Sequence, residues 1–150
     1  MIIIITEVNS LESWIKILMA VNIFLYRLTG GRLGGKMAGQ SVLLLDTVGR
    51  KTGRRHTIPI NYYRDGANYV VVASNWGQNH HPAWYYNLVN QPLTTIQVKN
   101  RHLRVRARTA SDQEYDRLWQ SVTSQNEFYV RYQKQTWRKI PLVILTEMVS

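Results

Sequence analysis

The chain has 150 residues, 45% of them hydrophobic, and carries 19 lysines and arginines against nine aspartates and glutamates, a formal net charge of +10. This length and composition indicate one globular domain over residues 1–150. The absence of cysteine excludes disulfides, cysteine nucleophiles, thiolate zinc sites and iron–sulfur clusters, and it suits a reducing cytoplasm. The positive charge favours an anionic partner: a phosphorylated small molecule, nucleic acid or an acidic membrane surface.

Residues 9–29 are predicted to form an amphipathic helix. Asn9 with Glu12 resembles a capping box, and apolar residues recur at helical spacing through the segment. The glycine-rich residues 30–40 that follow are predicted to form a flexible linker.

Two interpretations of this helix stay open. It can pack on the protein core, or it can lie in a membrane interface or cover an apolar pocket. The stretch between Lys16 and Arg27 is too short to cross a bilayer, which needs about 20 apolar residues. We therefore expect a cytoplasmic protein with the option of peripheral membrane contact through its N-terminal helix.

The rest of the chain is rich in strand-like runs. They cover residues 42–47, 57–63, 69–74, 94–98, 102–109 and 140–147. Asp65-Gly66 is a hairpin turn signal. About six mostly antiparallel strands with short turns predict an α+β protein built on a small barrel-like sheet.

Three flanking helices are predicted between these strands. Pro82 is well placed in the first turn of a short helix. Ser111 with Glu114 forms a capping box at the start of a longer one. After a break near residues 124–126, a short helical piece carries Tyr129 and Tyr132.

The turn over residues 47–56 is the main candidate for binding. It contains four fixed cations and two glycines between two strand-like runs. Backbone amides and guanidinium groups in such a turn can converge on a small polyanion. A solvated basic hairpin loop is an equal alternative on this segment alone.

The sequence lacks the motifs of several classes of hydrolytic site. It has no HExxH motif, no GxSxG elbow and no carboxylate pairing typical of glycosidases, and we expect no metal site. Many aromatic residues accompany the cations. A planar cofactor with an anionic tail would use both features, and so would single-stranded nucleic acid, although many of these aromatics can be core residues.

Several segments together resemble the deazaflavin-dependent nitroreductase family, whose members use the reduced cofactor F420. The matching segments are residues 25–35, the basic turn 49–54, residues 64–66, residues 71–75, residues 81–88 and the closing residues 140–144. The similarity runs in order over roughly residues 14–147.

The resemblance implies a split β-barrel fold related to FMN-binding barrels. It also implies roles for particular residues. Those expected to hold the phosphate and polyglutamate tail are Arg50, Lys51, Gly53 and His56. Those expected to border the deazaflavin ring and its linker are Pro59, Val72, Ser74, Asn75, Trp84 and Asn87. Those expected to face the substrate are Ser74, Tyr129 and Tyr132.

Some positions differ from the family pattern. His56 stands where well-known members often carry arginine, Asn75 and Trp76 replace a Lys-Gly pair, and Asn126 replaces a tyrosine.

The hypothesis is therefore a reductase that passes hydride from reduced F420 to an apolar, electron-poor small molecule such as a quinone or nitro compound. Two alternatives remain at this stage. One is an FMN-dependent oxidoreductase of the same fold, and the other is a non-catalytic module for anionic lipid or nucleic acid. We expect no nucleic acid partner, and the oligomeric state stays open.

Overall fold

The computed structural model describes residues 2–149, with side chains from residue 10 onward. Its helices are α1 (Ile2–Thr29), α2 (Ala83–Asn90), α3 (Asp112–Gln125) and α4 (Phe128–Gln135), with a short 3-10 turn η1 (Asn75–Gly77). Its strands are β1 (Lys36–Met37), β2 (Gln40–Val48), β3 (Arg55–Asn61), β4 (Tyr63–Asp65), β5 (Asn68–Val72), β6 (Leu93–Val98), β7 (Arg101–Thr109) and β8 (Leu142–Glu147).

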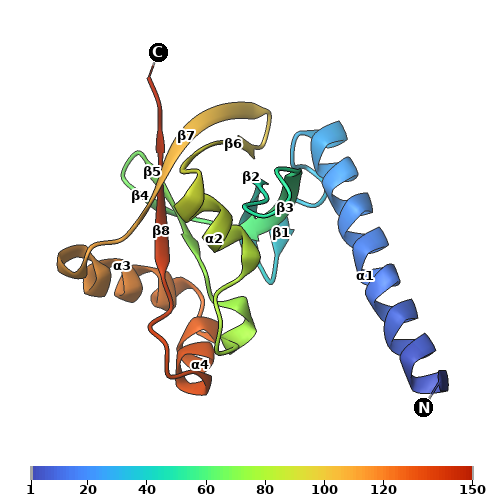
Figure 1. The fold of residues 1–150 in the computed structure, drawn as a ribbon. Coiled ribbons are helices and arrows are strands. Elements are labelled where there is room, and N and C mark those ends of the chain that lie inside the picture. The colour runs from blue at the N-terminus through green and yellow to red at the C-terminus, as the bar shows by residue number, and fades with distance from the viewer. Residues whose placement is uncertain (1, 150) are drawn as a thin grey trace.

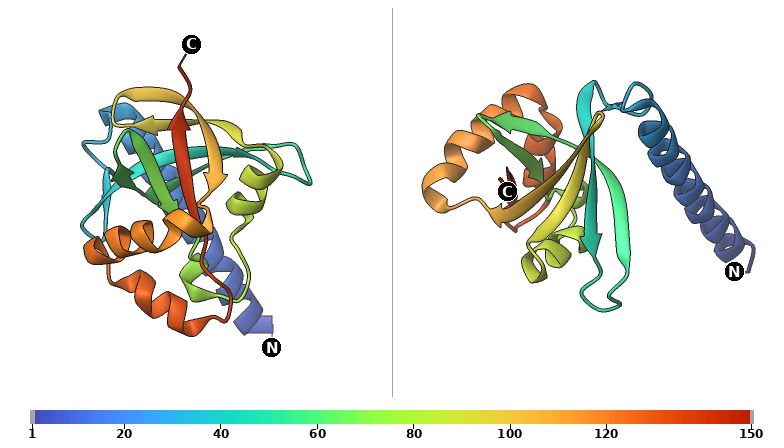
Figure 2. Two further views of the ribbon diagram at one scale, coloured as in Figure 1. Left: turned by 90° about the vertical axis from the view of Figure 1, so that its left-hand side faces the viewer. Right: turned by 90° about the horizontal axis from the view of Figure 1, so that it is seen from above.

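The strands form one curled antiparallel sheet (Figures 1 and 2). The path is β1-β2-β6-β7-β8-β5-β4, with β3 paired to β2 outside this path. Every strand pair in the described chain is antiparallel. The prediction of an α+β split barrel is confirmed. The sheet has eight strands rather than about six, because the run 57–63 divides into β3 and β4 and a short β1 was not anticipated.

Side-chain alternation places most of the buried apolar residues in two cores, one on each face of the sheet, and a smaller cluster forms around Tyr26. In β7, Leu103, Val105 and Ala107 are buried while the intervening arginines are exposed, as the sequence pattern predicted. These residues belong to the core inside the barrel, which Leu88 of α2 joins. A second core lies between the other face of the sheet and the helices α3 and α4.

Helix α1 stands apart from the barrel along most of its length (Figures 1 and 2). It begins at Ile2 rather than at residue 9, because no proline or glycine interrupts the chain before Gly30 and the predicted cap at Asn9 lies inside the helix. Its end is fixed by Tyr26, which is buried and whose hydroxyl donates to the Val42 carbonyl over 3.0 Å. Across residues 2–149, no helix combines the length and apolar character needed to span a bilayer.

The predicted linker 30–40 is only partly a linker. Residues Lys36 and Met37 form β1, which pairs with the start of β2. The side-chain amide of Asn61 donates to the Met37 carbonyl over 3.0 Å. The glycine content of the segment predicted flexibility, but these backbone and side-chain hydrogen bonds hold its second half against the barrel.

Candidate active site

One cleft collects all the predicted site residues except Gly53. It consists of two adjoining cavities of about 430 and 420 Å3, which share Ile58 of β3 and Trp84 of α2 as walls. We call them the cationic half and the uncharged half after the residues that line them. The shared walls place the two cavities side by side.

The cationic half is formed by the turn between β2 and β3 and by the start of α2. Its lining residues are Thr47, Gly49, Arg50, Lys51, Thr52, His56, Ile58, Ala83, Trp84 and Asn87. None of these is acidic. In the side chains described, residues 10–149, neither Arg50 nor Lys51 takes part in an ion pair. Cations without carboxylate partners in a cavity wall are available to an anionic ligand.

Asn87 connects the basic turn to the barrel. Its side chain is buried, its Oδ1 accepts the backbone N–H of Arg50 over 3.1 Å, and its Nδ2 donates to Thr47 Oγ1 over 3.2 Å. The Arg50 guanidinium lies 4.7 Å from the centroid of the Tyr86 ring, which restricts its direction. Helix α2 therefore fixes both the backbone and the side chain of Arg50.

Gly53 shapes the turn without lining either cavity. Its φ of +69° lies in the left-handed region, which glycine adopts without a steric penalty. Its N–H donates to the Gly49 carbonyl over 2.7 Å, and the Gly49 N–H donates to the Arg54 carbonyl over the same distance. Gly53 thus shapes the turn that carries Arg50 and Lys51, and its expected part in holding the tail of the cofactor stays a prediction.

The uncharged half lies between β3, β5, η1 and α4. Its lining residues are Met19, Met37, Ala38, Ile58, Pro59, Ile60, Asn61, Val72, Ser74, Asn75, Trp76, Pro82, Trp84, Asn126, Phe128, Tyr129 and Tyr132. No charged side chain is among them. The residues predicted to border the ring or face the substrate all line this half, except Asn87, which lines the cationic half. Met19 of α1 also lines it and was not predicted. Such a cavity favours an apolar, planar ligand.

Tyr129 is a buried hydroxyl in the wall of this half. The side-chain amide of Asn126 donates to the Tyr63 hydroxyl over 3.2 Å, and the Tyr63 hydroxyl donates to the Tyr129 hydroxyl over 3.1 Å. Either hydroxyl of this pair can donate or accept, so with Tyr63 as the donor the Tyr129 proton can be directed to a ligand in the cavity. Burial raises the pKa of Tyr129 well above its usual range, so the phenol stays protonated at neutral pH.

The other predicted contacts in this half have different surroundings. The Ser74 carbonyl accepts hydrogen bonds from Arg138 and from the Gly77 N–H. The Asn75 amide donates to the His80 carbonyl over 3.0 Å, so it is used within its own loop. Tyr132 stands edge-on to Tyr129, with ring centroids 6.3 Å apart.

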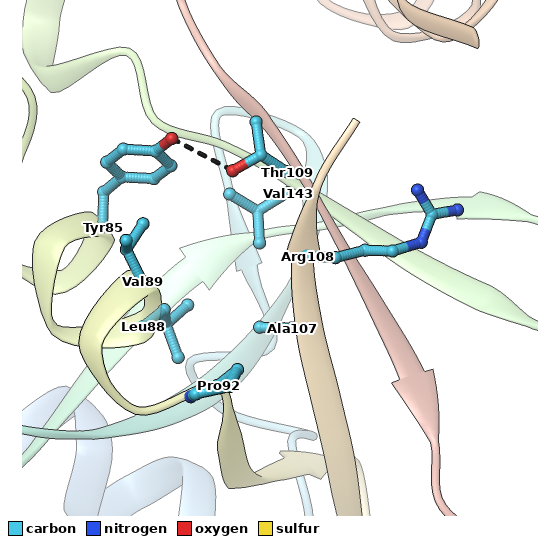
Figure 3. Close-up of a pocket in the computed structure, with 8 residues that line it drawn as sticks. All are labelled: Tyr85, Leu88, Val89, Pro92, Ala107, Arg108, Thr109 and Val143. Carbon is cyan, nitrogen blue, oxygen red and sulfur yellow. Dashed lines mark hydrogen bonds between the residues drawn. The ribbon is translucent and has the colours of Figure 1, made fainter. Parts of the chain in front are cut away.

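A third cavity lies on the other side of α2 and holds none of the predicted residues. Its volume is about 210 Å3, and Figure 3 shows it lined by Tyr85, Leu88, Val89 and residues of β7 and β8. The hydroxyls of Tyr85 and Thr109 lie 3.0 Å apart in a hydrogen bond, and Arg108 points away from the other side chains. Its size and the absence of an inward cation suit it less well than the cleft to a cofactor with an anionic tail.

Sequence reasoning missed two residues that organise the cleft, Tyr63 and Arg138. Tyr63 lies 66 positions from Tyr129 and Arg138 lies 64 positions from Ser74. No local pattern predicts either contact.

Comparisons with known proteins find similar chains. A family model described as F420H(2)-dependent quinone reductase matches residues 18–147. An F420H(2)-dependent quinone reductase of Mycobacterium tuberculosis is 41% identical over 126 residues, which are 81% of this chain and 85% of that protein.

Solved structures are similar as well. The structure of an F420H2-dependent reductase, FDR-A, has a TM-score of 0.64 and 30% identity, and the match covers 69% of this chain and 92% of that one. A structure described as a domain-swapped dimer has a TM-score of 0.67 and 26% identity, and that match covers 89% of this chain and 98% of the other.

Proposed function

The chain belongs to the F420H(2)-dependent quinone reductase family, as an oxidoreductase that uses F420 and acts on quinones, and on this premise we propose how its cleft divides the work. The phosphate-bearing tail of F420H2 lies in the cationic half. Its ring lies along Ile58 and Trp84, and the quinone lies in the uncharged half.

The separation of charge within one cleft carries this proposal. Arg50 and Lys51 line a cavity without acidic residues, and the adjoining cavity has no charged residue at all. A ligand with an anionic tail and a planar ring fits that arrangement in one orientation only. The same arrangement disfavours nucleic acid, whose phosphates need cations along a continuous track.

The chain itself would orient the reactants and stabilise charge. When bound, F420H2 supplies a hydride, so the protein needs no redox group of its own. Arg50 and Lys51 would balance the tail phosphate, and Asn87 would keep the turn in place before the cofactor arrives. Tyr129 would donate a hydrogen bond to the quinone carbonyl oxygen, which gains negative charge as hydride reaches the ring. Ser74 and Tyr132 would complete the wall on the acceptor side.

The direct test is cofactor choice followed by turnover. We expect F420 to bind at least tenfold more tightly than FMN in a fluorescence titration. Addition of 1,4-naphthoquinone to the protein with F420H2 should then restore the absorbance of oxidised F420. Tighter binding of FMN, or no oxidation of F420H2 beyond the rate without protein, would refute the proposal. A nitroimidazole acceptor assayed in parallel tests the nitroreductase alternative.

Membrane contact through α1 is a further part of the proposal. The helix exposes large apolar side chains along its projecting length: Leu11, Trp14, Ile15, Ile17, Leu18, Val21, Phe24 and Leu28. On the same helix, Met19 lines the uncharged half of the cleft. A helix that lies in the lipid interface would therefore bring the acceptor side of the cleft close to quinones dissolved in the bilayer.

Vesicle flotation tests this contact. We expect the protein to float with vesicles that contain anionic phospholipid, and the double variant Leu18→Glu/Phe24→Glu to remain in the soluble fraction. A second copy of the chain is the alternative occupant, since a similar structure is described as a domain-swapped dimer. Absence of flotation, with a dimer by light scattering that the same double substitution dissociates, would favour that alternative.

A further inference from the structure

Trp76 is an exposed tryptophan at the rim of the uncharged half. Its side chain is 74% exposed, yet it lines the cavity and meets Tyr132 edge-on, with ring centroids 6.3 Å apart. Tyr132 meets Tyr129 in the same way. Three aromatic rings therefore lead from the solvent edge of the cleft to the proposed hydrogen-bond donor.

The backbone at this position is strained. Trp76 has a φ of +58° and the preceding Asn75 has a φ of +47°, and neither residue is a glycine. Bulky residues rarely adopt this left-handed conformation unless the surrounding structure imposes it. The strain therefore has to be balanced by contacts of the loop around η1.

Arg138 supplies those contacts. It is only 6% exposed, and its guanidinium donates to the carbonyls of Ala73, Ser74 and Gln78 over 3.2, 2.6 and 2.8 Å. These carbonyls lie immediately before and after η1. In the described side chains Arg138 has no carboxylate partner, so backbone carbonyls take the place of a counter-ion.

His81 completes the set of partners around Arg138. Its Nδ1 lies 2.9 Å from Arg138 Nη1, and because arginine only donates, this nitrogen accepts. Burial and the neighbouring guanidinium lower the pKa of His81, which keeps its ring neutral and able to accept. Gly77 closes the loop on the other side: a Cβ there would lie 3.0 Å from the Tyr132 carbonyl.

We propose that Trp76 determines acceptor specificity by packing against the apolar substituent of a quinone, and that Arg138 is the positioning residue that holds Trp76 at the rim. The inference rests on the proposed function of the cleft. Acceptors long enough to reach the solvent edge bind more tightly because they contact the indole of Trp76. Small acceptors confined to the interior do not make this contact.

The first experiment compares two acceptors in two variants. Trp76→Gly removes the indole and suits the left-handed backbone, and Trp137→Gly is the matched control at a tryptophan that is 84% exposed outside the cleft. For Trp76→Gly we expect kcat/KM for 2-decyl-1,4-naphthoquinone to fall at least fivefold relative to kcat/KM for 1,4-naphthoquinone. Trp137→Gly should leave this ratio unchanged. An unchanged or increased ratio in Trp76→Gly would overturn the inference.

The second experiment tests the positioning role of Arg138. Arg138→Lys keeps the charge but cannot reach three carbonyls at once, and Arg117→Lys is the same substitution at an exposed arginine paired with Asp65. We expect Arg138→Lys to shift the acceptor ratio in the same direction as Trp76→Gly, and Arg117→Lys to leave it unchanged. An Arg138→Lys protein with the wild-type ratio would refute the positioning role.

Binding of the quinone without turnover distinguishes a failure of the Trp76 contact from a failure of the proposed reductase function. In the absence of F420, the decyl quinone should quench the tryptophan fluorescence of the wild-type protein at lower concentration than it quenches Trp76→Phe. If the quinone quenches the wild-type protein at lower concentration than Trp76→Phe, but the wild-type protein does not oxidise F420H2, the proposed function fails and the contact with Trp76 is retained. If F420H2 is oxidised and the quenching curves coincide, the inference about Trp76 fails alone.

Discussion

Two basic regions of this protein use the same residue types in different ways. Beside α3, Arg108 of β7 pairs with Glu114, and Arg117 of α3 pairs with Asp65 of β4 over 2.8 Å. In the cleft, Arg50 and Lys51 face a cavity without any carboxylate. Paired cations connect elements of the fold, whereas unpaired cations in a cavity wall are available to bind an anionic ligand. The net charge of +10 alone did not distinguish the two groups.

The double variant Arg50→Ala/Lys51→Ala tests this contrast most strongly. Each substitution should weaken F420 binding by more than tenfold, about 1.4 kcal/mol, so the pair should raise the Kd roughly 100-fold. Thermal stability should change little because both side chains face solvent in the cleft. Fluorescence titration of F420 is the measurement, with Arg117→Ala as the control that should bind F420 normally. Unchanged affinity in the double variant would remove the basic turn from the site.

Tyr129→Phe tests the uncharged half, where the effect should appear in turnover rather than in cofactor affinity. Loss of a hydrogen-bond donor to a developing oxyanion costs roughly 100-fold or more in kcat in well-studied sites. We expect a loss of about tenfold to 100-fold here, with the Kd for F420 unchanged, from stopped-flow oxidation of F420H2 by naphthoquinone. Tyr63→Phe should give a smaller loss, because it removes only the hydrogen bond that orients Tyr129. Full kcat in Tyr129→Phe would exclude this donor.

Asn87→Ala tests whether F420 binding requires the basic turn to be ordered before the cofactor binds. The variant loses the contacts to the Arg50 N–H and to Thr47 while keeping both cations. We expect the Kd for F420 to rise about fivefold, about 1 kcal/mol, because the turn must then be ordered by the ligand. Asn90→Ala on the exposed side of the same helix is the matched control. Equal titration curves for the two variants would argue against this role.

Acid titration tests the paired region and should give the smallest effect. Hydrogen bonds from Arg108 and from the Ser111 backbone lower the pKa of Glu114 to about 2, and Arg117 lowers the pKa of Asp65. Because both folded-state pKa values are depressed, their stabilisation is present above the unfolded pKa near 4 and is lost as the pH falls toward 2.

Glu114→Gln isolates this ion pair, since glutamine keeps the capping-box geometry. The Tm of the variant should depend less on pH between 5 and 3 than the wild-type Tm. The effect at neutral pH should stay below about 1 kcal/mol because the pair is exposed. F420 affinity should be unchanged. Parallel Tm profiles for the two proteins would show that the pair contributes nothing.

The features that the sequence predicted are those with local causes. The alternation in β7 follows from side chains on opposite faces of a strand, and the capping box at Ser111 and Glu114 is present as expected. The hairpin at Asp65-Gly66 joins β4 to β5. The resemblance supplied the rest of the candidate site, and its residues lie together around one cleft apart from Gly53.

The features that escaped prediction depend on contacts between distant segments. Nothing near Tyr63 in the chain indicates that it meets Tyr129, and nothing near Arg138 indicates that it binds three carbonyls around η1. The start of α1 was wrong because a capping pattern is compatible with a helix interior when no residue stops the helix upstream. Residues 30–40 were predicted to be a flexible linker because glycine content indicates conformational freedom. It does not indicate the pairing with β2 and the hydrogen bond from Asn61 that hold Lys36 and Met37 in place.

Pro59 has a consequence beyond the cleft. Among the described strands, β3 pairs only with β2, so its other margin is an open edge with unpaired backbone groups. Such an edge can recruit strands from neighbouring molecules and so seed fibrils, and a proline placed there withholds one donor from that template. The same ring that borders the cleft thus also removes one backbone donor from an outer strand of the sheet.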